Sequence, residues 1–94
     1  MAQASEKGWG ATVQILKAVA DQRGWEHSRF RHHLIMVSRL RAETGDGEIR
    51  RLFRVACELH ENFYENTMPA FEVAESLDDI EVMVGKLLPL LNQA

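Results

Sequence analysis

The hydrophobic residues of the chain recur every three or four positions, which is the spacing of residues on one face of an α-helix. The first segment with this pattern runs from Ser5, a residue type that favours the N-cap, to about Arg23, and Gly24 is expected to end it. The second segment runs from Ser28 to about Gly45. Both segments predict amphipathic helices that bury one face.

Two further helices are predicted in the second half of the chain. Asp46 is expected to cap the third helix, which is the longest, and Pro69 interrupts its pattern. The fourth begins around residues 67–70 and continues almost to the C-terminus, with breaks expected near Ser76 and before Pro89. Four helices with short connections predict an all-α fold, an antiparallel up-and-down four-helix bundle.

The length of 94 residues suits one small domain spanning residues 1–94. The inward faces of the first two helices are expected to carry Trp9, Val13, Leu16, Ala20, Phe30, Leu34, Val37 and Leu40. These apolar stripes are wider than four short helices need, so we expect a homodimer. The candidate residues for the dimer surface are Trp9, Ile15, Met36 and Phe71, and the alternative is that they complete the core of the monomer.

The composition excludes several classes of protein. No run of about 18 apolar residues exists, and the N-terminal residues lack the apolar stretch of a signal peptide, so we expect a cytoplasmic protein without a membrane segment. Cys57 is the single cysteine, which excludes an intramolecular disulfide and favours a buried, inert thiol within the third helix.

The chain offers few residues for a metal or a cofactor. None of its histidines forms the pair four residues apart that is typical of a helical zinc site; they are His27, His32, His33 and His60. Gly8 and Gly10 lack the preceding strand and the spacing of a phosphate-binding loop, and are expected where helices approach closely. We therefore expect neither a metal nor a cofactor.

The net charge of −3 is distributed unevenly along the chain. All eight arginines lie within residues 23–54, where four carboxylates leave a net charge of +4. Residues 55–94 contain eight carboxylates and one lysine, a net charge of −7. Because guanidinium groups suit bidentate recognition of phosphate or carboxylate, the basic block is expected to bind RNA, a nucleotide or an acidic protein surface. The alternative is a solvated face balanced by the acidic C-terminal third.

The third helix holds the strongest candidates for chemistry. His60 can take up and return a proton near neutral pH, and Arg54 can hold a phosphate, a combination that suffices for RNA cleavage without a metal. The two lie about 120° apart around a straight helix, so they would converge on one phosphate only across a two-fold axis. The alternative is that His60 is a half-buried structural histidine and Arg54 a solvated surface residue.

Four neighbouring residues are candidates for ligand binding. Tyr64 shares a helix face with His60, and Asn62 lies between them in the sequence. Arg50 and Arg51 belong to the basic block, one turn before the candidate catalytic arginine. We expect these four side chains to contact an RNA or nucleotide ligand.

Three stretches of the chain carry a resemblance to a known family. They are Ala4-Ser5-Glu6-Lys7-Gly8-Trp9-Gly10-Ala11, Arg23-Gly24-Trp25-Glu26-His27 and Leu59-His60-Glu61-Asn62-Phe63-Tyr64-Glu65-Asn66. Together with Arg54 and His60, which are separated by five residues, they resemble the HEPN superfamily of helical domains. Within it, they are most similar to the PaREP-type branch of small archaeal and bacterial proteins.

The resemblance implies an antiparallel helical bundle that dimerises through the helix bearing Arg54 and His60. In ribonuclease members of the superfamily, the Arg and His of both chains face a common cleft and act on the ribose 2′-hydroxyl and the scissile phosphate. Other members are non-catalytic binding modules. PaREP-type proteins usually have a further helix before the first of the three stretches, and we expect this chain to lack it.

The function that we expect is a non-catalytic RNA- or nucleotide-binding homodimer. A metal-independent endoribonuclease of toxin type, with Arg54 and His60 as its catalytic residues, is the first alternative. A structural module that binds an antitoxin-like protein partner is the second.

Overall fold

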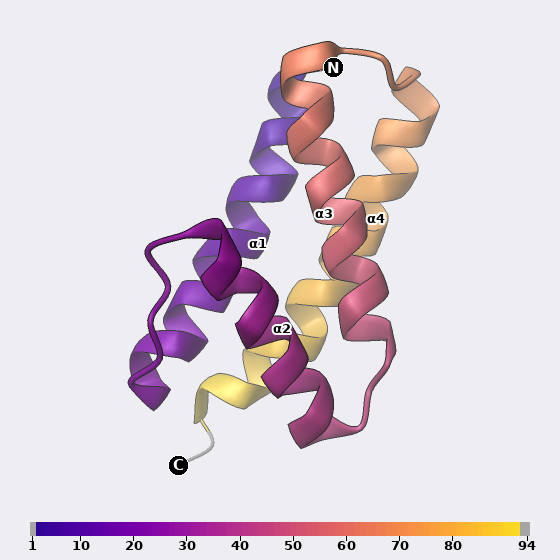
Figure 1. The fold of residues 1–94 in the computed structure, drawn as a ribbon. Helices are drawn as coiled ribbons and strands as arrows, with labels where there is room; N and C mark the ends of the chain where they lie inside the picture. The colour runs from indigo at the N-terminus through magenta and orange to yellow at the C-terminus, as the bar shows by residue number, and fades with distance from the viewer. Residues whose placement is uncertain (1, 93–94) are drawn as a thin grey trace.

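The structure is a computed structural model that describes residues 2–92, so the predicted domain extends slightly beyond them at both ends. Its helices are α1 (Ala2–Arg23), α2 (Phe30–Thr44), α3 (Glu48–Glu65) and α4 (Ala70–Leu87), followed by the 3-10 helix η1 (Leu88–Asn92) (Figure 1). No strand lies among the described residues, which confirms the all-α prediction. No helix in this part of the chain is long and apolar enough to cross a membrane.

Glycines end the first two helices, as the sequence predicted. Gly24 and Gly45 have φ angles of 70° and 71°, in the left-handed region that glycine enters without a steric penalty. The predicted start of α1 is wrong, because Ser5 is a buried residue inside that helix. α2 begins at Phe30 rather than at Ser28, because the residue before Phe30 has an extended backbone.

Asp46 supplies a side-chain hydrogen bond at the start of α3, although the N-cap position is Gly47, one residue later than predicted. Its Oδ1 accepts a hydrogen bond from the Glu48 amide at 3.0 Å, and its Oδ2 accepts one from Lys86 Nζ of α4 at 2.6 Å. The hydrogen bond from Lys86 is the main reason that the pKa of Asp46 lies below its ordinary value. One carboxylate thus bonds to the start of α3 and ties it to the C-terminal end of α4.

α4 continues through Ser76, so the predicted break at this serine is wrong. Val73 and Ile80 on either side of it are buried in one cluster with residues of α3, and this packing outweighs the weak helix preference of serine. The predicted break before Pro89 is confirmed, because α4 ends at Leu87 and the chain continues as η1.

The helices do not alternate strictly in direction. Figure 1 shows α3 running antiparallel to α1 and α4. α1 and α2 run in the same direction, since the rings of Trp9 and Phe30 lie 6.1 Å apart near one end of the pair and Arg23 pairs with Glu43 near the other. The predicted up-and-down order is therefore wrong for these two helices.

The connection over residues 24–29 runs back along α1 before α2 begins (Figure 1). Trp9 and Arg23 are separated by about 21 Å of helix, at about 1.5 Å per residue. The extended chain from Arg23 to Phe30 spans about 23 Å, so the connection covers that distance. His27 Nε2 lies 2.6 Å from Asp21 Oδ1, and this contact holds the connection to the end of α1.

α1, α3 and α4 form the centre of the molecule, and α2 covers only part of α3 (Figure 1). At Gly8 of α1, a Cβ atom would lie 2.9 Å from a side-chain atom of Leu59 and 2.8 Å from one of Leu77. The predicted close approach of helices is therefore confirmed at Gly8. It is wrong at Gly10, where a Cβ atom would meet nothing within 4 Å.

Two of the candidate dimer residues belong to the core. Ile15 and Met36 are buried, which excludes them from a dimer surface and confirms the alternative that they complete the monomer. Trp9 is partly buried and packs against the same core. Phe71 is 65% exposed, so it is the only one of the four candidates that faces largely toward solvent.

Part of the predicted inward face of α2 meets solvent. Phe30 and Leu34 are 51% and 48% exposed, so their predicted place in the core is wrong. Val37 and Leu40, further along the helix, are buried as predicted. One side of α2 packs against α1, whereas the side that faces α3 borders a hollow. The apolar stripe of α2 is therefore only partly covered.

Asn62 connects α3 to α1 and to the start of the α3–α4 connection. Its Nδ2 donates a hydrogen bond to Ser5 Oγ at 2.8 Å, and its Oδ1 accepts one from the Met68 amide at 2.7 Å. The residue is 1% exposed, so the structure places this candidate binding residue where a ligand does not reach it. Its role is to join three segments of the fold.

We expect Asn62→Ala to lower the free energy of unfolding by about 2–3 kcal/mol, because the change removes one buried and one partly buried hydrogen bond and leaves the Met68 amide without this acceptor. Urea denaturation measures the difference. The neighbouring substitution Glu61→Ala is the control, since Glu61 is exposed and should change the free energy by about 0.5 kcal/mol or less. Equal effects of the two substitutions would contradict a structural role for Asn62.

Candidate functional site

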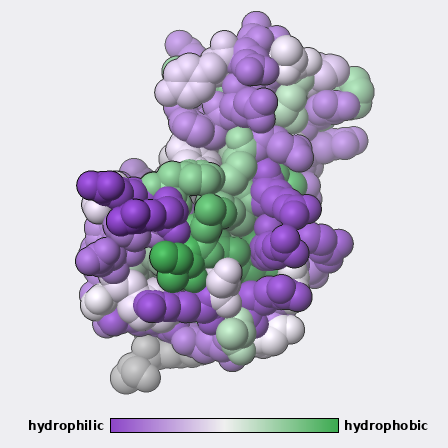
Figure 2. Space-filling model, in the orientation of Figure 1, coloured by the Kyte–Doolittle hydropathy of each residue, from purple (hydrophilic) through white to green (hydrophobic). Residues whose placement is uncertain are grey.

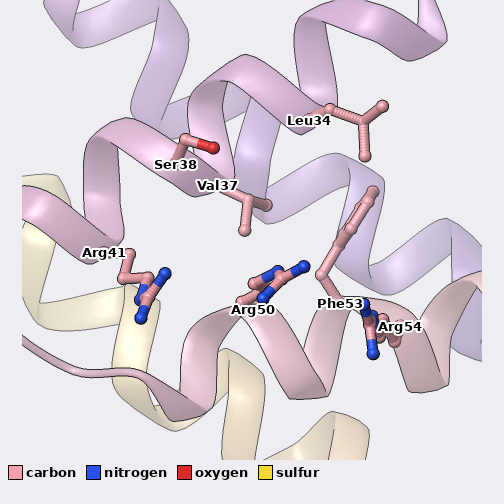
Figure 3. Close-up of a pocket in the computed structure, with 7 residues that line it drawn as sticks. All are labelled: Leu34, Val37, Ser38, Arg41, Arg50, Phe53 and Arg54. Carbon is pink, nitrogen blue, oxygen red and sulfur yellow. The ribbon is translucent and has the colours of Figure 1, made fainter.

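A groove of about 460 Å³ lies between α2 and α3 (Figure 3). Its lining residues are Leu34, Val37, Ser38, Arg41, Arg50, Phe53 and Arg54. Arg41 follows Val37 and Ser38 by four and three residues, which in turn follow Leu34 by three and four, and Phe53 and Arg54 follow Arg50 by the same intervals. This spacing places the residues on the side of each helix that faces its neighbour. We call this hollow the arginine groove.

Three arginines line the groove without a carboxylate partner. Arg41 comes from α2, and Arg50 and Arg54 come from α3 (Figure 3). None of the three forms an ion pair with any carboxylate in the described part of the chain. Three guanidinium groups beside one hollow create a positive potential that favours an anion such as phosphate.

Two other arginines of the basic block have carboxylate partners close by, whereas Arg29, Arg31 and Arg39 form no ion pair among the described residues. Arg23 pairs with Glu43, and Arg51 Nη2 lies 3.7 Å from Glu48 Oε2 on the same helix. Arg51, a predicted binding residue, does not line the groove. Arg23 and Arg51 are therefore balanced by carboxylates of the block itself and not, as the alternative had it, by the acidic C-terminal third.

The floor and one end of the arginine groove are apolar. Val37 and Phe53 are buried, and Leu34 is half exposed at the end of the groove. Phe30 continues this apolar surface, because its ring lies 6.2 Å from that of Phe53. Figure 2 shows a hydrophobic area near the middle of this face with hydrophilic surface on both sides. The groove therefore offers an apolar surface and an anion site next to each other.

A second hollow continues the groove beyond Arg41. It has a volume of about 490 Å³ and is lined by Ser38, Arg41, Ala42, Gly45 and Gly47. Ser38 and Arg41 line both hollows. The joined path from Leu34 to the turn between α2 and α3 is about 16 Å long, at about 1.5 Å per residue of α2.

His60 lies at the contact between α1 and α3, outside the arginine groove. Its Nδ1 is 2.9 Å from Glu6 Oε1, and its ring stacks on that of Trp9 with centroids 4.6 Å apart. The structure thus does not bring Arg54 and His60 into one pocket within the chain, as their spacing on the helix predicted. The half-buried histidine of the structural alternative agrees with these contacts.

Tyr64 lies at the edge of the His60 ring, with centroids 5.4 Å apart. The side chain is exposed and does not line the groove. Of the six predicted site residues, the structure therefore brings together Arg50 and Arg54 and places the other four elsewhere.

Sequence reasoning missed the contribution of α2 to this site. Leu34, Ser38 and Arg41 follow one another at intervals of four and three residues, which is a helical signal that was present. The spacing within α2 does not show that this side of the helix packs beside the side of α3 that carries Arg50 and Arg54. Only the packing of the two helices joins the two sets of residues.

His33 is a buried histidine beside the rings of Trp9 and Phe30, and its own ring lies edge-on to Trp9 with centroids 6.1 Å apart. Neither of its ring nitrogens has a hydrogen-bond partner in the described part of the chain. Burial is the main cause that lowers the pKa of His33, and the nearby charge of Lys17 lowers it further. This histidine is therefore held in its neutral form.

Cys57 is half-buried, and burial raises the pKa of its thiol. A raised pKa reduces the reactive thiolate at neutral pH, which agrees with the predicted inert thiol. Among the described residues, no group of three or more histidine, cysteine or carboxylate side chains is placed to hold a metal ion.

Comparison with known protein families identifies a match over most of the chain. Residues 1–84 match the model of the Archaeal PaREP1/PaREP8 family. The matched range includes every residue that lines the arginine groove, together with His60 and Glu6. No curated protein and no solved structure matches the chain.

We expect the stability of the protein to fall as the pH drops below about 6.5, because the unfolded chain protonates His33 at a higher pH than the folded chain does. The loss continues until the pH reaches the lowered pKa of the folded state. Thermal denaturation at about pH 7.5 and about pH 5.5 measures it, and the decrease should be smaller in His33→Leu. An equal decrease in both proteins would show that His33 does not contribute.

Proposed function

The chain belongs to the archaeal PaREP1/PaREP8 family, and we propose that it binds phosphate groups of an RNA or a nucleotide in the arginine groove. The observation that carries the proposal is the set of three arginines without carboxylate partners around one hollow. Two oxygens of one phosphate can accept hydrogen bonds from two N–H groups of the same guanidinium, and these charge-assisted bonds are stronger than neutral ones. Binding also releases counterions from the polyanion.

The shape of the groove supports a nucleic-acid ligand over a flat acidic protein surface. A flat surface would contact Arg41, Arg50 and Arg54 at the rim but would not enter the hollow between the two helices. A nucleotide carries both an anionic group and an uncharged ring system, so it matches the two kinds of surface together. The antitoxin-like partner of the second alternative thus has less support from this site.

A homodimer is the second part of the proposal. Phe71 and Val82 are 65% and 48% exposed, and their spacing of three helical turns places them on the same outer side of α4. This side of α4 replaces Ile15 and Met36, which are buried, as the candidate dimer surface. Exposed Glu75 and Asp78 lie between them on this side, so the proposed dimer surface combines apolar contacts at Phe71 and Val82 with polar contacts.

Sedimentation equilibrium tests the dimer. We expect a mass of twice 10.7 kDa at micromolar concentration, and a shift toward the monomer in Phe71→Ser. Glu72→Ser changes the adjacent exposed residue and is the control, since it removes no apolar surface. A wild-type mass of 10.7 kDa would contradict the proposal.

The endoribonuclease alternative depends on two chains, because Arg54 and His60 do not share a pocket in one. The observation in its favour is the contact of His60 with the Glu6 carboxylate, which can orient an imidazole for proton transfer. Cleavage of a structured RNA in EDTA that disappears in both His60→Ala and Arg54→Ala would establish this activity.

We expect Arg50→Gln to weaken binding of an RNA oligonucleotide by about five- to tenfold and to reduce the salt dependence of binding by about one counterion. Fluorescence anisotropy at several salt concentrations measures both quantities. Arg51→Gln is the matched control, because it removes the same charge from the next residue, which does not line the groove. Equal effects of the two substitutions would show that the charge of the block, and not the groove, binds the ligand.

A further inference from the structure

We propose that the ligand of the arginine groove is a single-stranded nucleic acid, one base of which packs on Leu34 and Phe30. This inference rests on the proposed binding of phosphate and specifies the class of ligand. It follows from the exposed apolar end of the groove, from the length of the path along the arginines, and from what each type of nucleic acid can present to them.

The apolar end of the groove is exposed and firmly supported. Leu34 and Phe30 are 48% and 51% exposed, although they belong to the same helix side as the buried Val37. The Phe30 ring lies 6.1 Å from Trp9 and 6.2 Å from Phe53, both of which pack into the core. This surface is therefore held in place for contact with a flat, uncharged group such as a base.

The path along the groove is longer than a single phosphate needs. Arg54 lies near the Leu34 end, Arg50 lies one turn before it on α3, and Arg41 lies at the junction with the second hollow. These positive groups follow the helix axes over about 10 Å, and the second hollow extends the path beyond Arg41 to about 16 Å. Successive phosphates of a chain can meet them in turn, as in other grooves that follow a nucleic-acid backbone.

A duplex cannot use the apolar end of the groove. The flat faces of its bases are stacked inside the helix, so only base edges, sugars and phosphates would face Leu34 and Phe30. Contact of these apolar side chains with charged phosphates would remove water from the phosphates without compensation. A single strand can turn a base toward the apolar end and leave its phosphates beside the arginines, so the groove favours unpaired strands.

The test measures binding of a fluorescent oligonucleotide of about 12 residues and mixed sequence as single-stranded RNA, as single-stranded DNA, and as the same RNA annealed to its complementary strand. We expect both single strands to bind at least about tenfold more tightly than the duplex, and ATP to compete weakly. The RNA and DNA arms then show which of the two single strands the groove prefers.

Two neighbouring residues of α2 provide matched variants. Leu34 and Ile35 are both 48% exposed, but only Leu34 lines the arginine groove. Leu34→Ala should weaken single-strand binding about threefold to fivefold and leave duplex binding unchanged, because the base loses part of its apolar contact. Ile35→Ala removes a similar side chain from the same helix and should change neither. Phe30→Ala should act like Leu34→Ala.

The outcomes separate this inference from the proposed function. If Arg50→Gln weakens binding but Leu34→Ala acts like Ile35→Ala and the duplex binds as tightly as a single strand, the inference is overturned and phosphate binding stands. If no oligonucleotide binds at low salt, both are overturned. Equal competition by a polyglutamate peptide would show that the groove binds an acidic protein segment, which also overturns the inference.

Discussion

α2 lies parallel to α1 because contacts hold it at both ends, the rings of Trp9 and Phe30 at one and the pair of Arg23 with Glu43 at the other. Since α3 runs opposite to α1, α2 and α3 are antiparallel (Figure 1). This direction places Arg41 beside the start of α3 and Leu34 beside its middle. If α2 ran the other way, its side chains would meet α3 in the reverse order, and the charged and apolar ends of the groove would not form.

The three arginines of the arginine groove form no ion pairs with carboxylates of the described chain. Carboxylates are abundant in the C-terminal third, yet none of them reaches Arg41, Arg50 or Arg54 within the described residues. Positive groups that lie together without partners reduce stability slightly, and exposure to water and salt keeps the penalty small. A ligand that brings its own negative charge recovers this interaction, which is the physical basis of the proposed function.

α3 contacts several other segments, because successive residues of a helix point in directions that differ by about 100°. Leu59 faces the core, Asn62 joins α1 to the α3–α4 connection, and Arg54 faces the groove. His60 instead faces α1, where Trp9 and Glu6 hold it. The separation of Arg54 from His60 is therefore a property of the helix itself, and any common site for the two requires a second chain.

The sequence by itself determined the four helices, the glycine ends of the first two and the hydrogen bond of Asp46 at the start of α3, because hydrophobic spacing and local hydrogen bonds act within a few residues. Arg50 and Arg54 were both candidate site residues from the sequence, in different roles, and the structure places them beside one hollow. Only the tertiary structure decided the direction of α2, the exposure of Leu34 and the buried position of Asn62. These features depend on contacts between residues far apart in the chain, such as Asn62 with Ser5, and no local pattern contains them.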